Sequence, residues 1–253
     1  MSALLSPSAA LSSWIHPQFL SSDALREAAL TQRRVRYVVA DNFFRANKLK
    51  EFEAAMQDAA LQEDDVGSNY HSTALRVDRE SDVPFIRFLM SSEWHNFASH
   101  VLDSTLRLPG ESTIKWRRHP HEARGFWIHT DQDSEKPKAL AILCYLNKRW
   151  QTRDGGLLQI WDHAAPSSNP HSRRSFLWAD YLEQRLDFLE TEKTVEIEVA
   201  ATSGGQVARM ELLDQIVPTY NRVVFMDFQY SSAFHAVTPS HGKLRKGFLQ
   251  WLF

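Results

Sequence analysis

The features that this sequence lacks set the first limits on what the protein can be. It has a single cysteine, Cys144, and no apolar run of the roughly 18–20 residues that a membrane-spanning helix requires. One cysteine excludes an internal disulfide and fits a reducing compartment. The 29 basic and 31 acidic residues leave a net charge of -2, so no overall field favours nucleic acid or an anionic membrane. We therefore expect a cytoplasmic protein without nucleic-acid or membrane partners.

What is present is ordinary for a globular protein. Of the 253 residues, 43% are hydrophobic and 24% are charged, which is enough for a sizeable core. Residues 1–34 are expected to form an N-terminal extension, either loose or docked on the domain. We do not expect an export signal there, because the segment lacks a basic start and Pro7 interrupts its apolar residues. Residues 35–253 are expected to form one domain, with a helical part (35–110), a barrel core (111–162 and 221–253) and an insertion (163–220).

The first half of the domain is predicted to be mainly helical. A strand is predicted at Val35–Val39, and after it a helix capped by Asp41 or Asn42, where apolar side chains recur at helical spacing. A second helix is predicted at Glu93–Leu106. The polar, aperiodic stretch Asp64–Glu80 between them is expected to be a loop.

The second half changes to short segments rich in β-branched or aromatic residues and separated by turn signals. These predicted strands are Ser112–Arg118, Gly125–Asp131, Ala139–Asn147, Gly156–Trp161, Arg222–Phe228 and Lys243–Leu252. Strands that follow a helical half predict an α+β fold, with a β-sandwich or barrel flanked by helices. Within the insertion we predict a helix at Phe176–Leu189 and a strand at Thr194–Val199, and we expect a lid, binding wall or partner surface.

Three residues of the second half could bind a metal ion. His129 and Asp131 lie two apart on a predicted strand and would therefore point to one face. His235 follows a later strand and could face them across a barrel. Two imidazoles and one carboxylate are the ligand set of non-haem iron(II) oxygenases. A bare His-x-Asp pair also occurs by chance, and alone it is more often surface polarity.

The last predicted strand and the strand at Ala139–Asn147 add two polar side chains. Arg245 would share a face with Gly247, Leu249 and Trp251. A buried guanidinium needs an anionic partner, and the missing side chain of Gly247 would leave room for one. The carboxylate of a cosubstrate would fit this position. The alternative is that this segment is an exposed edge strand with Arg245 in solvent. Tyr145 could donate its hydroxyl to the same carboxylate or, alternatively, to a core carbonyl.

Three further expectations concern residues outside this set. Cys144 lies in an apolar run, which predicts a buried and inert thiol. Gly155-Gly156 is predicted to form a hairpin turn before a strand and not a phosphate-binding loop. Arg76 and Arg117 could contact a substrate carboxylate, but we expect both to be surface charges.

These motifs together resemble one family. The chain is similar to the prolyl 4-hydroxylase branch of the iron(II)/2-oxoglutarate dioxygenases, over Ile114–Phe253 less the insertion. The resemblance is carried by His129-Thr-Asp131, Tyr145-Leu-Asn-Lys-Arg-Trp150, Asp154-Gly-Gly-Leu-Leu158, His235, Arg245 and Trp251. It implies a double-stranded β-helix, a jelly-roll or cupin-like barrel formed by two antiparallel sheets.

The resemblance also implies roles for single residues. His129, Asp131 and His235 would bind iron(II), and Arg245 and Tyr145 would bind 2-oxoglutarate. Where the family often has a tyrosine before a proline, this chain has His119-Pro120, and His119 is a weaker candidate for a cosubstrate contact. The related halogenases replace the ligand carboxylate with a small residue, so Asp131 argues against halogenation.

The expected activity is hydroxylation of an unactivated C–H bond in an amino acid, whether free, in a peptide or in a natural-product intermediate. Dioxygen and 2-oxoglutarate would be consumed, succinate and CO₂ released, and ascorbate is a candidate stimulant. The alternatives are hydroxylation of a prolyl residue in a protein or of a sugar, a non-catalytic module, or a zinc-binding cupin-like hydrolase, which has no need of Tyr145 and Arg245. The partner would be a small-molecule or peptide substrate. The oligomeric state is not predicted.

Overall fold

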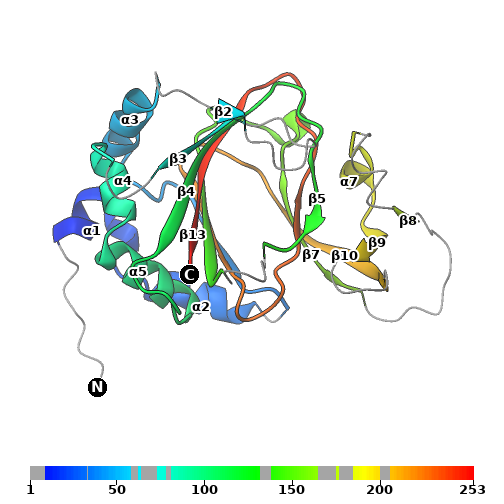
Figure 1. Ribbon diagram of the computed structural model, residues 1–253, viewed down its shortest axis with the longest axis horizontal. Helices are drawn as coiled ribbons and strands as arrows, with labels where there is room; N and C mark the ends of the chain where they lie inside the picture. Colours follow the sequence, from blue (N-terminus) through cyan, green and yellow to red (C-terminus); the bar gives the residue numbers. More distant parts are fainter. Residues whose placement is uncertain are drawn as a thin grey trace.

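Two curled sheets face each other, and helices cover the outer face of one of them (Figure 1). The structure is a computed structural model, and it describes residues 9–32, 34–57, 62–63, 73–77, 81–131, 138–164, 175–176, 185–199 and 206–253. None of the helices in this part of the chain combines the length and apolar composition that crossing a bilayer requires.

The helices precede most of the strands in the chain. They are α1 (Ala9–Trp14), α2 (Asp23–Thr31), α3 (Ala46–Ala55), α4 (Pro84–Leu89), α5 (Ser92–Leu102) and α7 (Phe188–Thr191), with 3₁₀ turns η1 (Pro17–Phe19) and η2 (Thr152–Asp154).

Within the described residues, the larger sheet has seven strands and the smaller has six. The larger sheet runs, from edge to edge, β1 (Tyr37–Ala40), β11 (Arg222–Asp227), β6 (Leu140–Tyr145), β13 (Arg245–Leu252), β4 (Ser112–His119), β3 (Thr73–Val77) and β2 (Gln62–Glu63). The smaller sheet runs β5 (Phe126–His129), β12 (His235–Val237), β7 (Leu158–His163), β10 (Gln206–Ile216), β9 (Thr194–Val199) and β8 (Ser175–Phe176). All pairings are antiparallel except that of β8 with β9. This is the predicted double-stranded β-helix with flanking helices.

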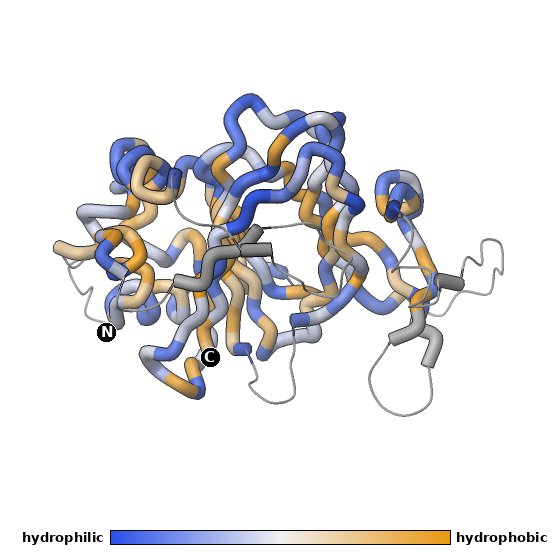
Figure 2. The backbone as a smooth tube through the Cα atoms, turned by 45° about the horizontal axis from the view of Figure 1, so that its top comes forward, coloured by the Kyte–Doolittle hydropathy of each residue, from blue (hydrophilic) through white to orange (hydrophobic). Residues whose placement is uncertain are grey.

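Hydrophobic side chains fill three layers. One cluster packs α1–α5 against the larger sheet, and its largest fully buried side chains include Trp94, Phe43 and Phe44. A second lies between the sheets, and a third packs α7 against the smaller sheet around Trp161. Figure 2 colours the backbone by hydropathy and shows hydrophobic stretches alternating with hydrophilic ones along the chain. The predicted burial of Cys144 is confirmed, since the residue is fully buried and burial raises the pKa of its thiol well above the ordinary value.

The described part of the N-terminal extension is docked on the domain. Ile15 is fully buried and forms a β-bridge with Phe44, and the amide of His16 donates to the carbonyl of Phe43. Helix α2 packs on α5. Of the two expectations for the extension, loose or docked, residues 9–32 therefore take the second.

Several predicted element ends were wrong. Asp41 does not cap a helix, because both its carboxylate oxygens accept hydrogen bonds from Arg222, and α3 begins only after Arg45. Helix α5 ends at Leu102, since Asp103 takes the left-handed conformation with φ 54°. The predicted loop at 64–80 contains strand β3, while its residues 64–72 and 78–80 lie outside the described residues.

The segment predicted to be an insertion contributes strands to the smaller sheet. The predicted strand Thr194–Val199 is confirmed as β9, and β10 joins it to β7 of the barrel. The helix predicted at 176–189 is wrong at its start, where β8 lies, and its residues 177–184 fall outside the described residues.

Candidate metal centre and active-site cavity

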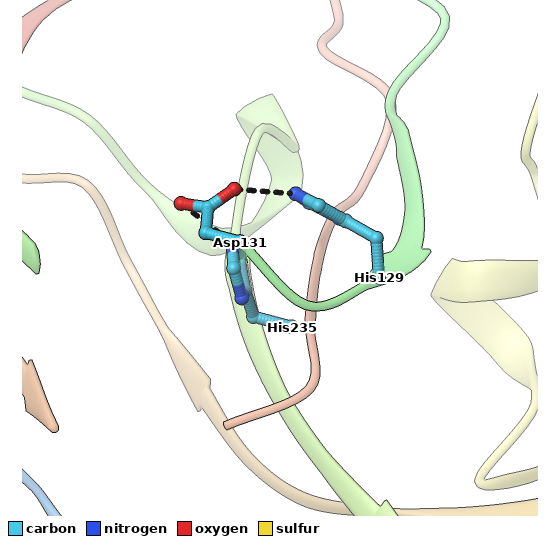
Figure 3. A group of neighbouring side chains, drawn as sticks. All are labelled: His129, Asp131 and His235. Carbon is cyan, nitrogen blue, oxygen red and sulfur yellow. Dashed lines mark ion pairs between the residues drawn. The ribbon is translucent and has the colours of Figure 1, made fainter. Parts of the chain in front are cut away.

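A histidine pair from neighbouring strands of the smaller sheet forms the centre of the candidate site. His129 ends β5, His235 begins β12, and the two residues are partners in the antiparallel register. Their ring centroids lie 4.2 Å apart. Asp131 follows β5 directly, so that one ligand atom from each of the three residues lies within 4.8 Å of the others (Figure 3). The structure therefore brings together the three residues that the sequence singled out.

The imidazoles are oriented by backbone carbonyls. The Nδ1 atom of His129 lies 2.7 Å from the carbonyl oxygen of Trp127, and Nδ1 of His235 lies 2.9 Å from that of Ala233. A carbonyl only accepts hydrogen bonds, so each Nδ1 carries the proton. In a neutral ring Nε2 then presents its lone pair to Asp131. Burial lowers the pKa of His235 to about 4, with the nearby His129 adding to the effect, so that ring is neutral at pH 7.

Asp131 completes a set of electron-pair donors. Its Oδ1 lies 3.4 Å from Nε2 of His129, and its Oδ2 lies 3.9 Å from Nε2 of His235. The indole Nε1 of Trp251 donates to Oδ2 at 2.7 Å. Burial alone would raise the pKa of Asp131, but hydrogen bonding and the charges of its neighbours hold it below the usual range, so the group is a carboxylate. Two imidazole lone pairs facing one carboxylate suit a divalent cation of the iron(II) type.

Asp131 does not lie on the strand that was predicted to carry it. Strand β5 ends at His129, so the alternation of a strand does not extend to Asp131. Asp131 instead reaches the site from the loop after the strand, while the hydroxyl of Thr130 donates to the carbonyl of Ser232. The three side chains still converge.

A cavity of about 420 Å³ extends from this centre between the two sheets. Its floor is a set of neighbouring strand positions on β4, β13 and β6. Across these strands, Arg245 pairs with His119, and Gly247 pairs with both Arg117 and Tyr145. Because alternate residues of a strand share a face, the whole row projects into one space. Arg245, Tyr145 and His119 all line the cavity that holds the histidine pair.

Arg245 is buried without an acidic partner among the described residues. The side chain is 6% exposed, its guanidinium lies 5.0 Å from the ring centre of Tyr145, and its Nε atom is buried without a hydrogen bond. The alternative of an exposed edge strand is wrong, because β13 lies between β6 and β4. A buried guanidinium is costly without an anion, and its two-pronged shape matches a carboxylate. This position therefore fits the distal carboxylate of 2-oxoglutarate.

His119 lies at the same end of the cavity and is 3% exposed. Burial lowers its pKa well below the ordinary value, and the positive charges of Arg245 and Arg117 lower it further. At neutral pH the ring is therefore uncharged and can still donate one hydrogen bond. These properties suit a neutral contact beside the Arg245 guanidinium.

Gly247 and Gly156 shape this end of the site, and the sequence explained neither of them correctly. A side chain on Gly247 would meet the carbonyl oxygen of Cys144 at 2.6 Å, so this glycine permits close strand packing instead of leaving room for a cosubstrate. Gly155 and Gly156 follow the 3₁₀ turn η2 and do not form a hairpin, because the flanking strands β6 and β7 belong to different sheets. Gly156 has φ +62°, and a Cβ there would lie 2.9 Å from Cδ of Arg245. Its missing side chain leaves space for the arginine.

Three further cationic side chains line the cavity. Lys115 and Lys138 were not singled out, and the expectation that Arg117 is a surface charge was wrong, since the residue is partly buried in the cavity wall. The alternation from Lys115 through Arg117 to His119 on one strand was a usable signal. The side chain of Arg76 lies outside what the structure describes.

Comparison with known proteins places the fold and the family. A crystal structure of a Pseudomonas putida prolyl-4-hydroxylase aligns with a TM-score of 0.56 at 14% identity, covering 91% of this chain and 97% of that one. A Trichoplax adhaerens prolyl hydroxylase, in complex with a hypoxia-inducible factor peptide fragment, aligns with a TM-score of 0.58 at 14% identity, covering 93% and 92%. The α-ketoglutarate-dependent epimerase SnoN of nogalamycin biosynthesis gives 0.54 at 14% identity, covering 91% and 83%.

At these identities the solved structures establish the shared fold alone. None of the curated proteins compared with the chain matches it. The family model of the 2OG-Fe(II) oxygenase superfamily, however, matches residues 115–253, more than half of the sequence, and this range contains the histidine pair, Asp131 and Arg245. The chain therefore belongs to the 2OG-Fe(II) oxygenase superfamily and is a dioxygenase that uses iron(II), 2-oxoglutarate and dioxygen.

Proposed function

We propose that this dioxygenase hydroxylates an unactivated C–H bond of an amino acid or an amino-acid-derived molecule, releasing succinate and CO₂. One observation carries the proposal: the His129–Asp131–His235 cluster and the buried guanidinium of Arg245 line a single cavity. A metal-binding trio alone would suit several metalloproteins. A buried cation in the same space adds a place for a dicarboxylic cosubstrate.

The residues of this chain would act mainly by binding and orientation. His129, Asp131 and His235 would hold iron(II) through two Nε2 atoms and one carboxylate, leaving other coordination positions for the cosubstrate and dioxygen. Bound iron(II) and 2-oxoglutarate would supply the oxygen activation that converts C–H to C–OH. Arg245 would bind the distal carboxylate of 2-oxoglutarate, with hydrogen bonds from Tyr145 and, as a weaker candidate, His119.

The walls of the cavity would keep water away from the reaction. Apolar side chains from both sheets line it beside the histidine pair, namely Phe126, Leu143, Leu158, Val237 and Leu249. Exclusion of water strengthens each electrostatic contact with the bound carboxylate and protects reactive species from side reactions. Trp251 would fix the orientation of Asp131 through its indole hydrogen bond.

The alternative substrates are a prolyl residue of a protein and a sugar. The Trichoplax relative is a prolyl hydroxylase seen with a peptide, and this likeness of fold supports the first. SnoN is named as an epimerase, so the same fold also serves other oxidative outcomes. The absence of an acidic partner for Arg245 among the described residues favours a cosubstrate-using enzyme over a zinc-binding hydrolase or a module without catalysis.

Succinate release tests the proposal. The purified protein is incubated with iron(II), ascorbate and 2-oxoglutarate, first alone and then with pools of amino acids, peptides and sugars, and products are screened for the mass of one added oxygen atom. We expect slow succinate release without substrate and faster release with an amino-acid pool. Asp131→Ala should abolish both. Succinate release unaffected by Asp131→Ala, or hydroxylation confined to sugars, would contradict the proposal.

A further inference from the structure

Two adjoining hollows lie on the outer side of the larger sheet. Their volumes are about 450 and 300 Å³, and they share lining residues, so they form one groove. Helix α3 provides one wall, on the side of the sheet that the helices cover (Figure 1). Strands β4 and β13 and the chain after β6 provide the rest. We call this feature the α3 groove, and the residues common to both hollows are Glu53, Lys148, Leu244 and Lys246.

Strand alternation separates this groove from the active site. Arg117 and His119 of β4 line the active-site cavity. Trp116 and Arg118 alternate with them and therefore face the opposite side of the sheet, where both line the α3 groove. Lys246 of β13 pairs with Arg118 in the register and faces the same side. No residue that lines the active-site cavity also lines the groove, so the groove is a separate candidate site.

The groove is positively charged, although the sequence as a whole has a net charge of -2. The cationic side chains that line it are Lys50, Arg118, Lys148, Lys243 and Lys246. Glu53 is the one acidic side chain among the described residues of the lining. Its carboxylate already has partners, since the hydroxyl of Tyr220 donates to it at 2.9 Å and the ammonium of Lys246 lies 3.9 Å away. A bound ligand therefore meets an excess of positive charge.

Two of these cations face solvent from different walls of the groove. Lys50 on α3 and Lys148 after β6 are both exposed, and neither forms an ion pair with a described residue. Lys243, in contrast, pairs with Asp154 at 2.6 Å. Nζ of Lys148 lies 5.2 Å from the ring centre of Tyr220, an attraction that does not neutralise its charge. Lys50 and Lys148 are therefore charges that an anionic group in the groove can reach.

The groove also contains apolar surface that a purely ionic ligand would leave in water. Leu244 lines both hollows, and its side chain is 38% exposed. An exposed apolar residue inside a charged rim is typical of a protein-binding surface. Single-stranded nucleic acid, in contrast, stacks its bases on accessible aromatic faces. The two tryptophans of the lining, Trp116 and Trp150, are buried and offer no such face.

We infer that the α3 groove binds an acidic segment of a partner protein, whose carboxylates pair with Lys50 and Lys148 and whose apolar side chain covers Leu244. Two joined hollows suit an extended segment better than a single small anion. Complementary charge of this kind speeds association and selects among partners. The inference goes beyond the proposed hydroxylation and does not depend on it, because the groove shares no lining residue with the active-site cavity.

Fluorescence anisotropy of labelled peptides tests the inference on the full chain. The probe is a fluorescein-labelled peptide of glutamate residues with a central leucine, and the comparison peptides carry glutamine or lysine in place of the glutamates. We expect saturable binding of the acidic probe alone, lost at about 1 M salt, where the screening length falls to about 3 Å. The variant Lys50→Glu with Lys148→Glu should bind the probe about tenfold or more weakly, because each reversed charge turns an attraction into a repulsion.

The matched control reverses two exposed charges outside the groove, Lys193→Glu with Arg87→Glu. It changes the net charge by the same amount, so a general effect of charge would appear in both double variants. Leu244→Ser should weaken binding of the leucine-containing probe about threefold or more, because it removes the apolar contact. All three variants should bind 2-oxoglutarate as the wild type does, which shows that they are folded.

Several outcomes would overturn the inference. They are an absence of saturable binding by the wild type, equal weakening in the two double variants, and equal binding of the lysine peptide. Tighter binding of a labelled single-stranded DNA oligonucleotide than of the acidic probe would assign the groove to nucleic acid. Binding of the probe by the variant Asp64→Asn with Asp65→Asn, but not by the wild type, would assign the groove to an acidic segment of this chain instead of a partner.

Discussion

Replacement of Arg245 by alanine is the sharpest test of the cosubstrate site. The guanidinium is 6% exposed, and no described acidic residue pairs with it, so the proposed carboxylate partner comes from 2-oxoglutarate. Truncating one member of a buried, hydrogen-bonded charge pair costs about 2–5 kcal/mol. At about 1.4 kcal/mol for each factor of ten, the affinity for 2-oxoglutarate should fall by about 30-fold to several thousand-fold.

Where the loss falls in this range depends on the neighbouring charge. Arg117 projects from the neighbouring strand on the same face and lines the same cavity, so it could partly replace the lost guanidinium. A double variant, Arg245→Ala with Arg117→Gln, should therefore lose more affinity than Arg245→Ala alone. Arg245→Lys should be intermediate, because one ammonium keeps the charge and loses the two-pronged geometry.

Calorimetric titration of 2-oxoglutarate into the manganese(II) enzyme measures the change, and a titration of manganese(II) itself shows whether the metal site is intact. Lys246→Ala is the matched control, since Lys246 is the next residue on β13 and its ammonium lies 3.9 Å from Glu53, away from the cavity. The control should bind 2-oxoglutarate normally. Unchanged 2-oxoglutarate affinity in Arg245→Ala would refute the role given to this arginine.

Three further predictions follow from contacts of single residues. Gly156→Ala should lower the free energy of unfolding by about 1–3 kcal/mol, measured in urea, because a non-glycine residue at φ +62° is strained, and it should also weaken 2-oxoglutarate binding because the added Cβ lies 2.9 Å from Cδ of Arg245. Trp251→Phe removes the donor to Asp131 and should lower manganese(II) affinity about 10- to 100-fold in a calorimetric titration. Burial, together with the hydrogen bond to the carboxylate of Asp214, raises the pKa of Tyr37 above its ordinary value of 10.0. The unfolded chain therefore loses this proton at a lower pH than the folded protein does, so the free energy of unfolding should fall as the pH rises above 10.0. Tyr37→Phe should make that fall shallower in urea titrations.

Each of these predictions has a control in the same chain. Gly242→Ala has a similar φ of +67° and no heavy atom within 4 Å of the added Cβ, so it should lose stability and keep its 2-oxoglutarate affinity. Trp161→Phe removes an indole donor whose acceptor is Gln159 and not a metal ligand, so this variant should keep its manganese(II) affinity. Tyr230→Phe removes the phenol of a side chain that is 44% exposed and serves as the control for Tyr37→Phe in the same urea titrations. Equal effects in a variant and its control would contradict the corresponding prediction.

The sequence predicted the site where local periodicity was enough. Alternation placed Arg245 and Trp251 on one face of the last strand, and the structure has both lining the cavity. The residue types His129, Asp131 and His235 indicated a metal cluster, but only the pairing of β5 with β12 brings the two histidines together, and that contact is not encoded by spacing. Asp131 reached its place through a loop, which no strand pattern describes.

The cationic residues of the cavity show a second reason why the sequence alone did not predict the whole site. Lys115 and Arg117 alternate with His119 on one strand, which was a usable signal. Charged residues on a strand are usually solvated, however. The pairing of β4 with both β13 and β3, which makes this face interior, is a tertiary property that the sequence pattern does not show. Lys138 precedes its strand and carried no periodic signal. Similarly, the helix cap expected at Asp41 failed because Arg222, distant in sequence, takes both carboxylate oxygens.

Strand β13 sets the distance between the two ends of the active site. Arg245 and Trp251 stand six residues apart on one face of it, a span of about 20 Å at the usual rise per strand residue. The place for the tail of 2-oxoglutarate and the tryptophan beside the metal carboxylate are thus fixed relative to each other by one stretch of backbone, bonded on both sides to β4 and β6. Inserting or deleting a single residue between the two ends would turn one of them away from the reaction chamber.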